Sequence, residues 1–403
     1  MTNQIQNLKG FRDFLPVEAA KRKWLRDKLA SICEQWGFAP LETPTLEPLD
    51  LFTGQIGEDE KLFFKFKDQG DRDVALRYDQ TVPTCRVIAQ YQNTLTFPFK
   101  RYQIQPAFRA EKPQKGRYRE FTQVDADIFG IKTPDADAET IALSLDIYKQ
   151  LGFKRALVRI NTRVLFKDMP YEAITSIDKI KKIGDDGVIR EMESKGIELS
   201  KAKEYLSYVK NLKPNEDIIF ILKYLKDYGF PEDWYEFDPT IARSFSYSMG
   251  PIWEVEIPEA GYGMSVLGGE RYDGLLEKFA GRDIGGTGFG LGFDRTLEAA
   301  EIMKLIPILS VAGQVLVTIF SEDLRGESLQ VASALRKKTV AVDVYPTIDK
   351  LEKQLKYADK KEIPYVIIQG PDEVAKNVVQ LKDMKNRTSE TMTIEEAIKK
   401  LKS

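Results

Sequence analysis

The chain has 403 residues, 42% hydrophobic and 30% charged, which is enough for two or three domains that each bury a core. Its 60 basic and 62 acidic residues give a net charge of −2, so any nucleic-acid site must be a local patch. No run approaches 18 apolar residues, no apolar leader is present, and two cysteines cannot build a disulfide framework. We therefore expect a cytoplasmic protein without a membrane span.

Histidine does not occur in the sequence. Ser–His–Asp and Cys–His triads, imidazole general bases and histidine-ligated zinc are thereby excluded. With two cysteines, a zinc site of four thiolates is excluded as well, and we expect no metal held by protein side chains. An enzyme with this composition must work by positioning and electrostatics, with arginine, carboxylate, glutamine and tyrosine side chains.

Apolar spacing and chain breakers predict the elements of the first three hundred residues. In chain order these are a helix over 18–36, an extended segment over 38–44, strands over 101–111 and 121–130, a helix over 135–151, a strand over 154–161, a helical insertion over about 170–230, strands over 241–256 and 262–267, a glycine-rich stretch over 285–292 and a helix over 295–305. Pro307 marks a boundary.

Strand and helix patterns alternate after that proline. Strands are predicted over 314–320, 341–345, 365–369 and 378–381, and helices over 326–338, 348–360 and 394–401. This order predicts a small α/β domain with a largely parallel sheet.

The densest chemical signal is a predicted hairpin whose polar residues follow a period of two. They are Arg101, Gln103, Gln105, Arg109 and Glu111 on the incoming strand, and Gln123, Asp125 and Asp127 on the outgoing one. A polar strand face is costly to bury unless it meets a polar ligand. The intervening loop carries Lys112, Lys115, Arg117 and Arg119, a basic cluster that suits a polyphosphate or an RNA end. A solvated hairpin face is the alternative interpretation.

The second signal is a run of four glycines at alternate positions, from Gly286 to Gly292, followed by Arg295. On a strand they would share one bare face, which indicates the close approach of something flat such as an adenine ring. Arg295 begins the next helix, where it could reach a phosphate. The spacing is not that of a Rossmann or Walker loop. Close packing of a strand against a helix is the alternative.

These residues resemble the motifs of class II aminoacyl-tRNA synthetases. The hairpin is similar to motif 2, the glycine-rich strand ending in Asp294-Arg295 to motif 3, and Trp36 to Pro44 to motif 1, whose proline lies at the dimer interface of that class. Within the class, the chain resembles the histidyl-tRNA synthetases. The matching segments are Lys9 to Pro16, Leu76 to Pro83, Gln123 to Asp127, Arg271 to Leu275 and Lys353 to Lys361.

The resemblance implies an α+β fold with three parts. A class II catalytic domain, an antiparallel sheet with flanking helices, would cover 1–310 and contain the helical insertion at about 170–230. An α/β anticodon-binding domain would cover 311–403. The implied activity is ATP-dependent ligation of histidine to its tRNA through a histidyl-adenylate, by a homodimer that contacts the acceptor end and the anticodon. Mg²⁺ would arrive on the phosphates of ATP.

The resemblance also implies a role for individual residues. Arg109 would contact the α-phosphate and the amino-acid carboxylate, Arg243 the α-phosphate as a further catalytic cation, and Arg295 the γ-phosphate. The implied ATP site consists of Arg109, Glu111 (at the adenine amino group), Arg117, Phe121, Gly292 and Arg295. The implied amino-acid site consists of Asp79, Thr81 and Gln123 (at the ammonium), Asp127 (at an imidazole N–H), Tyr247, Ser248, Glu270 and Tyr272.

The sequence departs from the histidyl pattern beside the expected amino-acid pocket. The signature Arg-Gly-Leu-Asp-Tyr-Tyr reads Arg-Ser-Phe-Ser-Tyr-Ser over 243–248, and Glu270 replaces the glycine before Arg271. We predict that Glu270 takes the place of the lost tyrosine as second partner of the imidazole, with Ser248 leaving room. The alternatives are a ligase for another amino acid, and a non-catalytic histidine-sensing paralogue of the regulatory-subunit type. Such subunits usually lack the anticodon-binding domain and the motif arginines.

Overall fold

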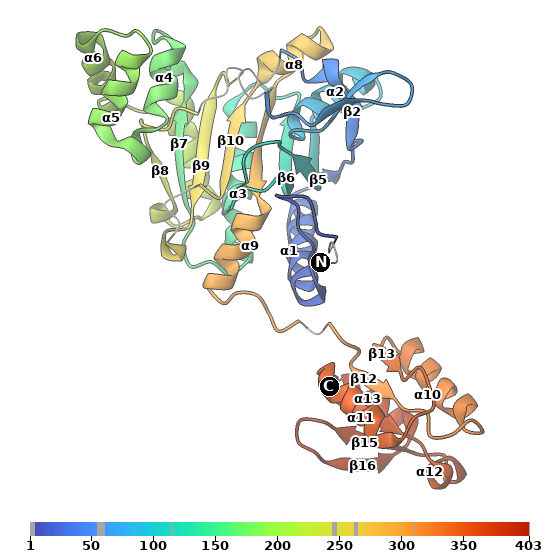
Figure 1. Ribbon diagram of the computed structural model, residues 1–403. Helices are drawn as coiled ribbons and strands as arrows, with labels where there is room; N and C mark the ends of the chain where they lie inside the picture. The colour runs from blue at the N-terminus through green and yellow to red at the C-terminus, as the bar shows by residue number, and fades with distance from the viewer. Residues whose placement is uncertain are drawn as a thin grey trace. The chain divides into compact units, whose positions relative to one another are not determined.

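The structure is a computed structural model that describes residues 5–54, 61–113, 116–243, 248–261, 265–309 and 311–402. Most of the chain up to Pro307 forms one compact unit, and residues from Ile308 onward, grouped with the short stretch Leu15–Ala20, form a second (Figure 1). No helix among the described residues is long and apolar enough to cross a bilayer.

The larger unit is built on an eight-stranded sheet in the order β1-β5-β6-β11-β10-β9-β7-β8. These strands are β1 (Ala39–Pro40), β5 (Phe99–Phe108), β6 (Glu120–Phe129), β7 (Leu157–Thr162), β8 (Tyr235–Phe237), β9 (Pro251–Glu256), β10 (Leu267–Arg271) and β11 (Gly286–Gly292). The six inner strands pair antiparallel, and only the edge strands β1 and β8 pair in parallel with their neighbours. The predicted antiparallel sheet is confirmed.

The register of the sheet aligns polar side chains with bare backbone. Across the β5–β6 hairpin, Arg101 lies opposite Asp127, and Gln105 lies opposite Gln123. On the other side of β6, Asp127 lies opposite Gly288. The polar face that the period of two predicted is therefore continuous with the glycine face of β11.

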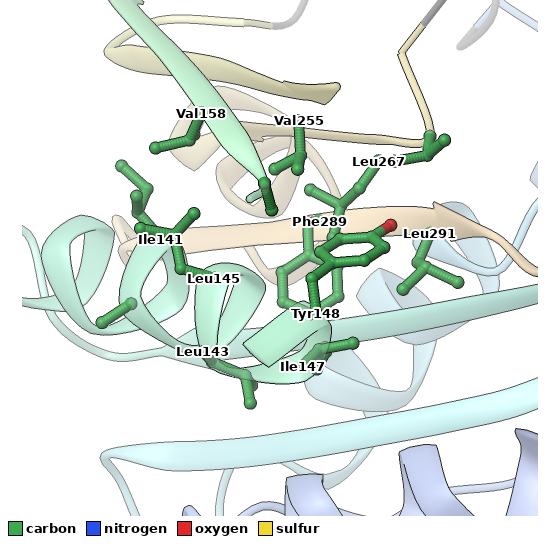
Figure 2. Close-up of a cluster of buried hydrophobic side chains, with 14 of the residues drawn as sticks. Ile141, Leu143, Leu145, Ile147, Tyr148, Val158, Val255, Leu267, Phe289 and Leu291 are labelled. Atoms are coloured by element: carbon green, nitrogen blue, oxygen red, sulfur yellow. The ribbon is translucent and has the colours of Figure 1, made fainter. Parts of the chain in front are cut away.

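The opposite face of the sheet carries the main hydrophobic core. Helix α3 (Pro134–Gln150) covers this face, and its Ile141 and Tyr148 are fully buried. Alternation along β11 turns Phe289 and Leu291 away from the glycine side and into this core, as Figure 2 shows. Each such side chain stabilises the fold by about 1.5–3 kcal/mol, and together they fix the sheet that carries the polar face.

Other elements flank the sheet. Four helices are α1 (Pro16–Gln35), α2 (Thr81–Tyr91), α8 (Asp273–Ala280) and α9 (Phe293–Ile302), and a small antiparallel sheet consists of β2 (Leu46–Pro48), β3 (Lys65–Lys67) and β4 (Asp73–Leu76). Helices α1, α3 and α9 match their predicted spans to within three residues.

The predicted insertion at about 170–230 contains four helices that divide between two cores. They are α4 (Tyr171–Ile177), α5 (Ile180–Ser194), α6 (Leu199–Lys210) and α7 (Glu216–Tyr228). Ile174, Val188 and Leu206 from the first three pack in a smaller core together with Ile241 and with Ile252 of β9. Ile221 of α7 instead joins the main core, so the last helix of this stretch supports the sheet rather than the insertion.

The strand predicted over 241–256 begins only at Pro251. Upstream of it, the carbonyls of Ile241, Ala242 and Arg243 accept hydrogen bonds from side chains rather than from a neighbouring strand. Residues 244–247 and 262–264 of the predicted strands lie outside the described part of the chain.

The smaller unit holds a five-stranded sheet in the order β13-β12-β14-β15-β16. Its elements are β12 (Val315–Val317), α10 (Arg325–Lys337), β13 (Val342–Val344), α11 (Leu351–Lys360), β14 (Tyr365–Ile368), α12 (Pro371–Ala375), β15 (Val379–Asp383), β16 (Ser389–Met392) and α13 (Ile394–Lys402). Only β13, β12 and β14 are parallel. The predicted strand over 378–381 is confirmed as β15, but it runs antiparallel and forms a hairpin with β16, a strand that was not predicted. The sheet is therefore mixed rather than largely parallel.

Candidate active site

The polar face of the sheet borders a cavity of about 510 Å³. Its lining includes most of the side chains predicted from the sequence, namely Asp79, Thr81, Arg109, Glu111, Arg117, Phe121, Gln123, Asp127, Arg243, Glu270, Tyr272, Gly292 and Arg295. Ser248 reaches this group through a hydrogen bond to Glu270. Tyr247 lies outside the described residues.

Arg109 follows the end of β5 and is held between aromatic rings. Its guanidinium lies 4.3 Å from the ring centroid of Tyr78 and 5.0 Å from that of Phe121. Its Nε also donates to the Tyr78 carbonyl at 3.4 Å. Ring faces attract and orient a cation without neutralising it, so these contacts suit an arginine that binds an anion in the cavity.

Arg295 lies in the first turn of α9, directly after the glycine-rich strand. Its Nη1 donates to the Ser265 carbonyl at 2.7 Å, which fixes the side chain along the cavity wall. The adjacent Asp294 accepts from Arg12 at 3.0 Å and from Arg22 at 2.5 Å. These two arginines, for which no sequence pattern predicted a role, tie α9 to the N-terminal segment and α1.

Buried carboxylates of β6 form the opposite part of the site. Asp127 accepts from the Tyr272 hydroxyl at 2.5 Å and pairs with Arg101 Nη2 at 2.6 Å. Gln123 donates to Asp125 at 2.9 Å. Arg101 is fully buried beneath both aspartates and supplies their countercharge. Periodicity placed this arginine on the polar face, but its function became visible only in the cross-strand register.

Burial dominates the titration of these carboxylates. It raises the pKa of Asp79 and of Asp127, and the charge of Arg101 opposes both effects. Burial raises the pKa of Asp125 to about 7, again opposed by Arg101. A cationic group entering the cavity would favour the ionised carboxylates, so this wall is suited to an ammonium or a protonated ring.

The buried carboxyl group of Asp125 should make the free energy of unfolding depend on pH. Its folded pKa of about 7 exceeds an unfolded value near ~3.9, so between these limits the folded state keeps a proton that the unfolded state has lost. Its contribution to stability therefore falls as pH rises from about 4 to about 7. We expect Asp125→Asn to gain stability relative to the parent between pH 5 and pH 8, by up to about 3 kcal/mol. Urea unfolding at both pH values measures this difference, with the exposed Asp186→Asn as the control. A difference independent of pH would contradict the assignment.

Glu270 forms a small hydrogen-bond network with Arg243 and Ser248, two residues of the segment that departs from the histidyl signature. Its Oε1 accepts from Arg243 Nη2 at 3.2 Å, and its Oε2 accepts from the Ser248 hydroxyl. Glu254 lies 3.8 Å from Arg243 Nη1. Ser248 thus contacts Glu270 directly, in addition to removing the bulk of the family's tyrosine. The network holds the Arg243 guanidinium at the cavity wall, against the bare backbone of Gly268.

The glycines of β11 make room chiefly for side chains of the protein itself. A Cβ at Gly288 would lie 2.0 Å from the Asp127 carboxylate, and one at Gly290 would lie 3.3 Å from that of Asp125. The glycine pattern predicted that some group comes close to the bare backbone of this strand. At Gly288 that group is the side chain of Asp127. Gly290 and Gly292 line the cavity.

The described residues contain no group of three or more aspartate, glutamate or cysteine side chains that could hold a metal ion. Two carboxylates of the cavity wall have side-chain partners, Asp127 with tyrosine and arginine and Glu270 with arginine and serine. Asp79 accepts from the backbone N–H of Val82 at 3.3 Å.

Comparisons with known proteins identify the family of this chain. A family model described as histidyl-tRNA synthetase matches residues 10–184, and one described as an anticodon binding domain matches 314–403. A histidine--tRNA ligase of Clostridium tetani is 34% identical, with 98% of each chain covered. The crystal structure of a histidyl-tRNA synthetase from Nostoc sp. PCC 7120 is 26% identical and gives a TM-score of 0.84 over 99% of both chains. A structure from Bacillus halodurans, described as an ATP phosphoribosyltransferase regulatory subunit/histidyl-tRNA synthetase, shares the fold at 22% identity, with a TM-score of 0.71 over 89% of this chain and 97% of its own. The chain therefore belongs to the histidyl-tRNA synthetase family.

Proposed function

We propose that this chain ligates histidine to its tRNA, first forming histidyl-adenylate from histidine and ATP and then transferring the acyl group to the terminal adenosine. One observation carries the proposal. Arg109, Arg243 and Arg295 come from distant parts of the sequence and line the same cavity as the buried carboxylates of Asp79 and Asp127. Arginines bind phosphate oxygens and carboxylates bind ammonium groups, so this single cavity suits both substrates of the first step.

The first step needs charge stabilisation more than proton transfer. The histidine carboxylate, already ionised at neutral pH, attacks the α-phosphorus of ATP, and the bond to pyrophosphate breaks. Arg109 and Arg243 would bind the α-phosphate oxygens as charge builds there, and Arg295 would bind the γ-phosphate. The lack of histidine side chains in the protein is no obstacle, because no general base is required.

The remaining ATP contacts follow from the cavity lining. We propose that Glu111 accepts from the adenine amino group, that Phe121 stacks on the ring, and that Gly292 admits the nucleotide against bare backbone. Arg117 pairs with Glu111 at 3.4 Å and is half exposed, so it can orient that carboxylate or contact a phosphate. Mg²⁺ bound to the phosphates of ATP would neutralise part of the pyrophosphate charge.

The amino-acid end of the cavity would use the carboxylate wall. Asp79, Thr81 and Gln123 would receive the ammonium of histidine, and Asp127 would accept an imidazole N–H. Tyr272 donates to Asp127 and so fixes its orientation. Glu270, on the same side of the strand end as Tyr272, would offer the second partner for the ring.

Replacing Glu270 tests this pocket. Glu270→Gly should raise the KM for histidine by about 10-fold, because a buried charge-assisted hydrogen bond is lost. Adding Ser248→Tyr to this variant should recover part of the loss. The matched control is Glu254→Gln, which alters only the longer contact to Arg243 and should change the KM for histidine less than Glu270→Gly does. A Glu270→Gly enzyme with the parent's KM for histidine would exclude Glu270 from the pocket.

The rest of the proposal concerns the tRNA and the assembly. We propose that residues 1–310 carry out catalysis and that 311–403 bind the anticodon, supported by the family match over 314–403. We further propose a homodimer, based on the motif 1 resemblance of residues 36–44 and on the position of β1 at the sheet edge, and a cytoplasmic location. Histidine-dependent ATP–pyrophosphate exchange tests the first chemical step, and charging of a total tRNA fraction tests the second.

A further inference from the structure

The loop that carries Arg243 is bound at the end of β7, a strand that contributes no residue to the cavity lining. In the sheet, β7 lies between β8 and β9, and the described residues of the loop between these two strands are Asp238–Arg243 and Ser248–Gly250. Backbone bonds hold both ends of this loop to β7 and the short helix that follows it. Asp238 N–H donates to the Ile160 carbonyl at 3.0 Å, and Arg163 N–H donates to the Gly250 carbonyl at 2.8 Å.

Asn161, at the end of β7, holds the middle of the incoming arm of this loop. Its side chain is fully buried. Its Nδ2 donates to the Pro239 carbonyl at 3.0 Å and to the Ile241 carbonyl at 2.9 Å. One amide group thus satisfies two backbone acceptors that no strand pairs.

Arg163, two residues further along, holds the part of the loop that contains the proposed catalytic cation. Its Nη1 donates to the Ala242 carbonyl at 3.2 Å and to the Arg243 carbonyl at 3.3 Å. Arg243 itself has a φ of 52°, a left-handed conformation that costs free energy for any residue other than glycine. Such a conformation persists only where the surroundings impose it, and it occurs preferentially at functional sites.

These contacts determine where the Arg243 side chain can point. Its guanidinium is held by Glu270 at the cavity wall, and its carbonyl accepts from Arg163. Asn161 holds the residues just before it, through the carbonyls of Pro239 and Ile241. We propose that Asn161 and Arg163 are positioning residues for adenylate formation, which hold Arg243 in the conformation that presents its guanidinium to the α-phosphate. This inference rests on the proposed function of Arg243.

Loss of the hydrogen bonds from Asn161 or Arg163 should lower kcat rather than weaken substrate binding. In full-length protein, Arg163→Met keeps the aliphatic stem but removes the donors, and it should lower kcat of histidine-dependent ATP–pyrophosphate exchange by about 10-fold, with the KM for ATP changed less than about threefold. Arg163→Lys should regain part of this loss. Asn161→Asp, which replaces the donor by a second acceptor, should lower kcat similarly. Arg155→Met removes an arginine that pairs with the exposed Asp233 and does not contact the loop, and it should leave exchange within about twofold of the parent.

A double-mutant cycle separates positioning from general damage to the fold. If Arg163 acts through Arg243, Arg163→Met should have less than about a twofold effect on kcat in an Arg243→Ala background. An undiminished effect in that background, or parental kcat in both Arg163→Met and Asn161→Asp, would overturn the inference. Parental exchange in Arg243→Ala would instead overturn the proposed role of Arg243 itself.

Discussion

Replacing Arg243 or Arg109 by alanine should lower the rate of histidine-dependent ATP–pyrophosphate exchange by about 10²–10³-fold. Each guanidinium is oriented before the substrate arrives, Arg109 by the rings of Tyr78 and Phe121 and Arg243 by Glu270. Because no reorganisation is needed when charge develops on the α-phosphate, the full benefit of each cation is available in the transition state. The loss should therefore fall on kcat as well as on kcat/KM.

Steady-state exchange with saturating histidine and varied ATP measures this effect. The control is Arg155→Ala, which removes an arginine outside the cavity that pairs with Asp233. It should retain the parent's rate, and thermal unfolding should show both catalytic-site variants folded. Parental exchange in Arg109→Ala and Arg243→Ala would mean that these arginines do not act on the reacting phosphate.

A chain ending at Pro307 should keep adenylate formation to within a few-fold but lose charging of tRNA by about 100-fold or more. The two activities would separate because the cavity lies entirely within the larger unit, whereas binding of a long polyanion depends on the sum of many cationic contacts. The hydrophobic cores of residues after 308 contain no side chain of the larger unit, so the truncation leaves the main core intact.

Exchange and charging should be measured on the same preparation of the truncated chain, with circular dichroism as the control for folding. Equal loss of both activities in a folded protein would contradict the proposed division of labour. Retained charging would exclude residues 308–403 from tRNA recognition.

Local patterns in the sequence predicted the polar face well, because alternation along a strand is a property of neighbouring residues. The polar positions of β5 and β6 and the glycines of β11 lie on the face that the period of two indicated. What the pattern could not show was which group lies opposite which. The pairing of Arg101 with Asp127, and the need for glycine at 288 beneath that aspartate, depend on the register between strands.

Contacts between distant segments explain where the elements predicted from the sequence differ from the structure. Residues 241–250 have the composition of a strand, but the carbonyls of Ile241 and Arg243 are bound by side chains 80 residues earlier in the chain. Helix α7 has the same amphipathic pattern as the insertion helices, and periodicity alone does not say which core its apolar face joins. Strand β16 is short and mostly polar, so it carries no period-two signal and is specified by its pairing with β15.

The central claim is that the cavity activates histidine with ATP. ATP–pyrophosphate exchange with the full-length chain, measured separately for each of the twenty amino acids, tests it most directly. We expect exchange with histidine that exceeds exchange with any other amino acid by at least about 100-fold. The proposed pocket would hydrogen-bond both ring nitrogens of histidine, and it would reject side chains that leave its carboxylates unpaired. Exchange driven by a different amino acid would contradict the assignment of histidine, and no exchange with any of the twenty would contradict the assignment of a ligase.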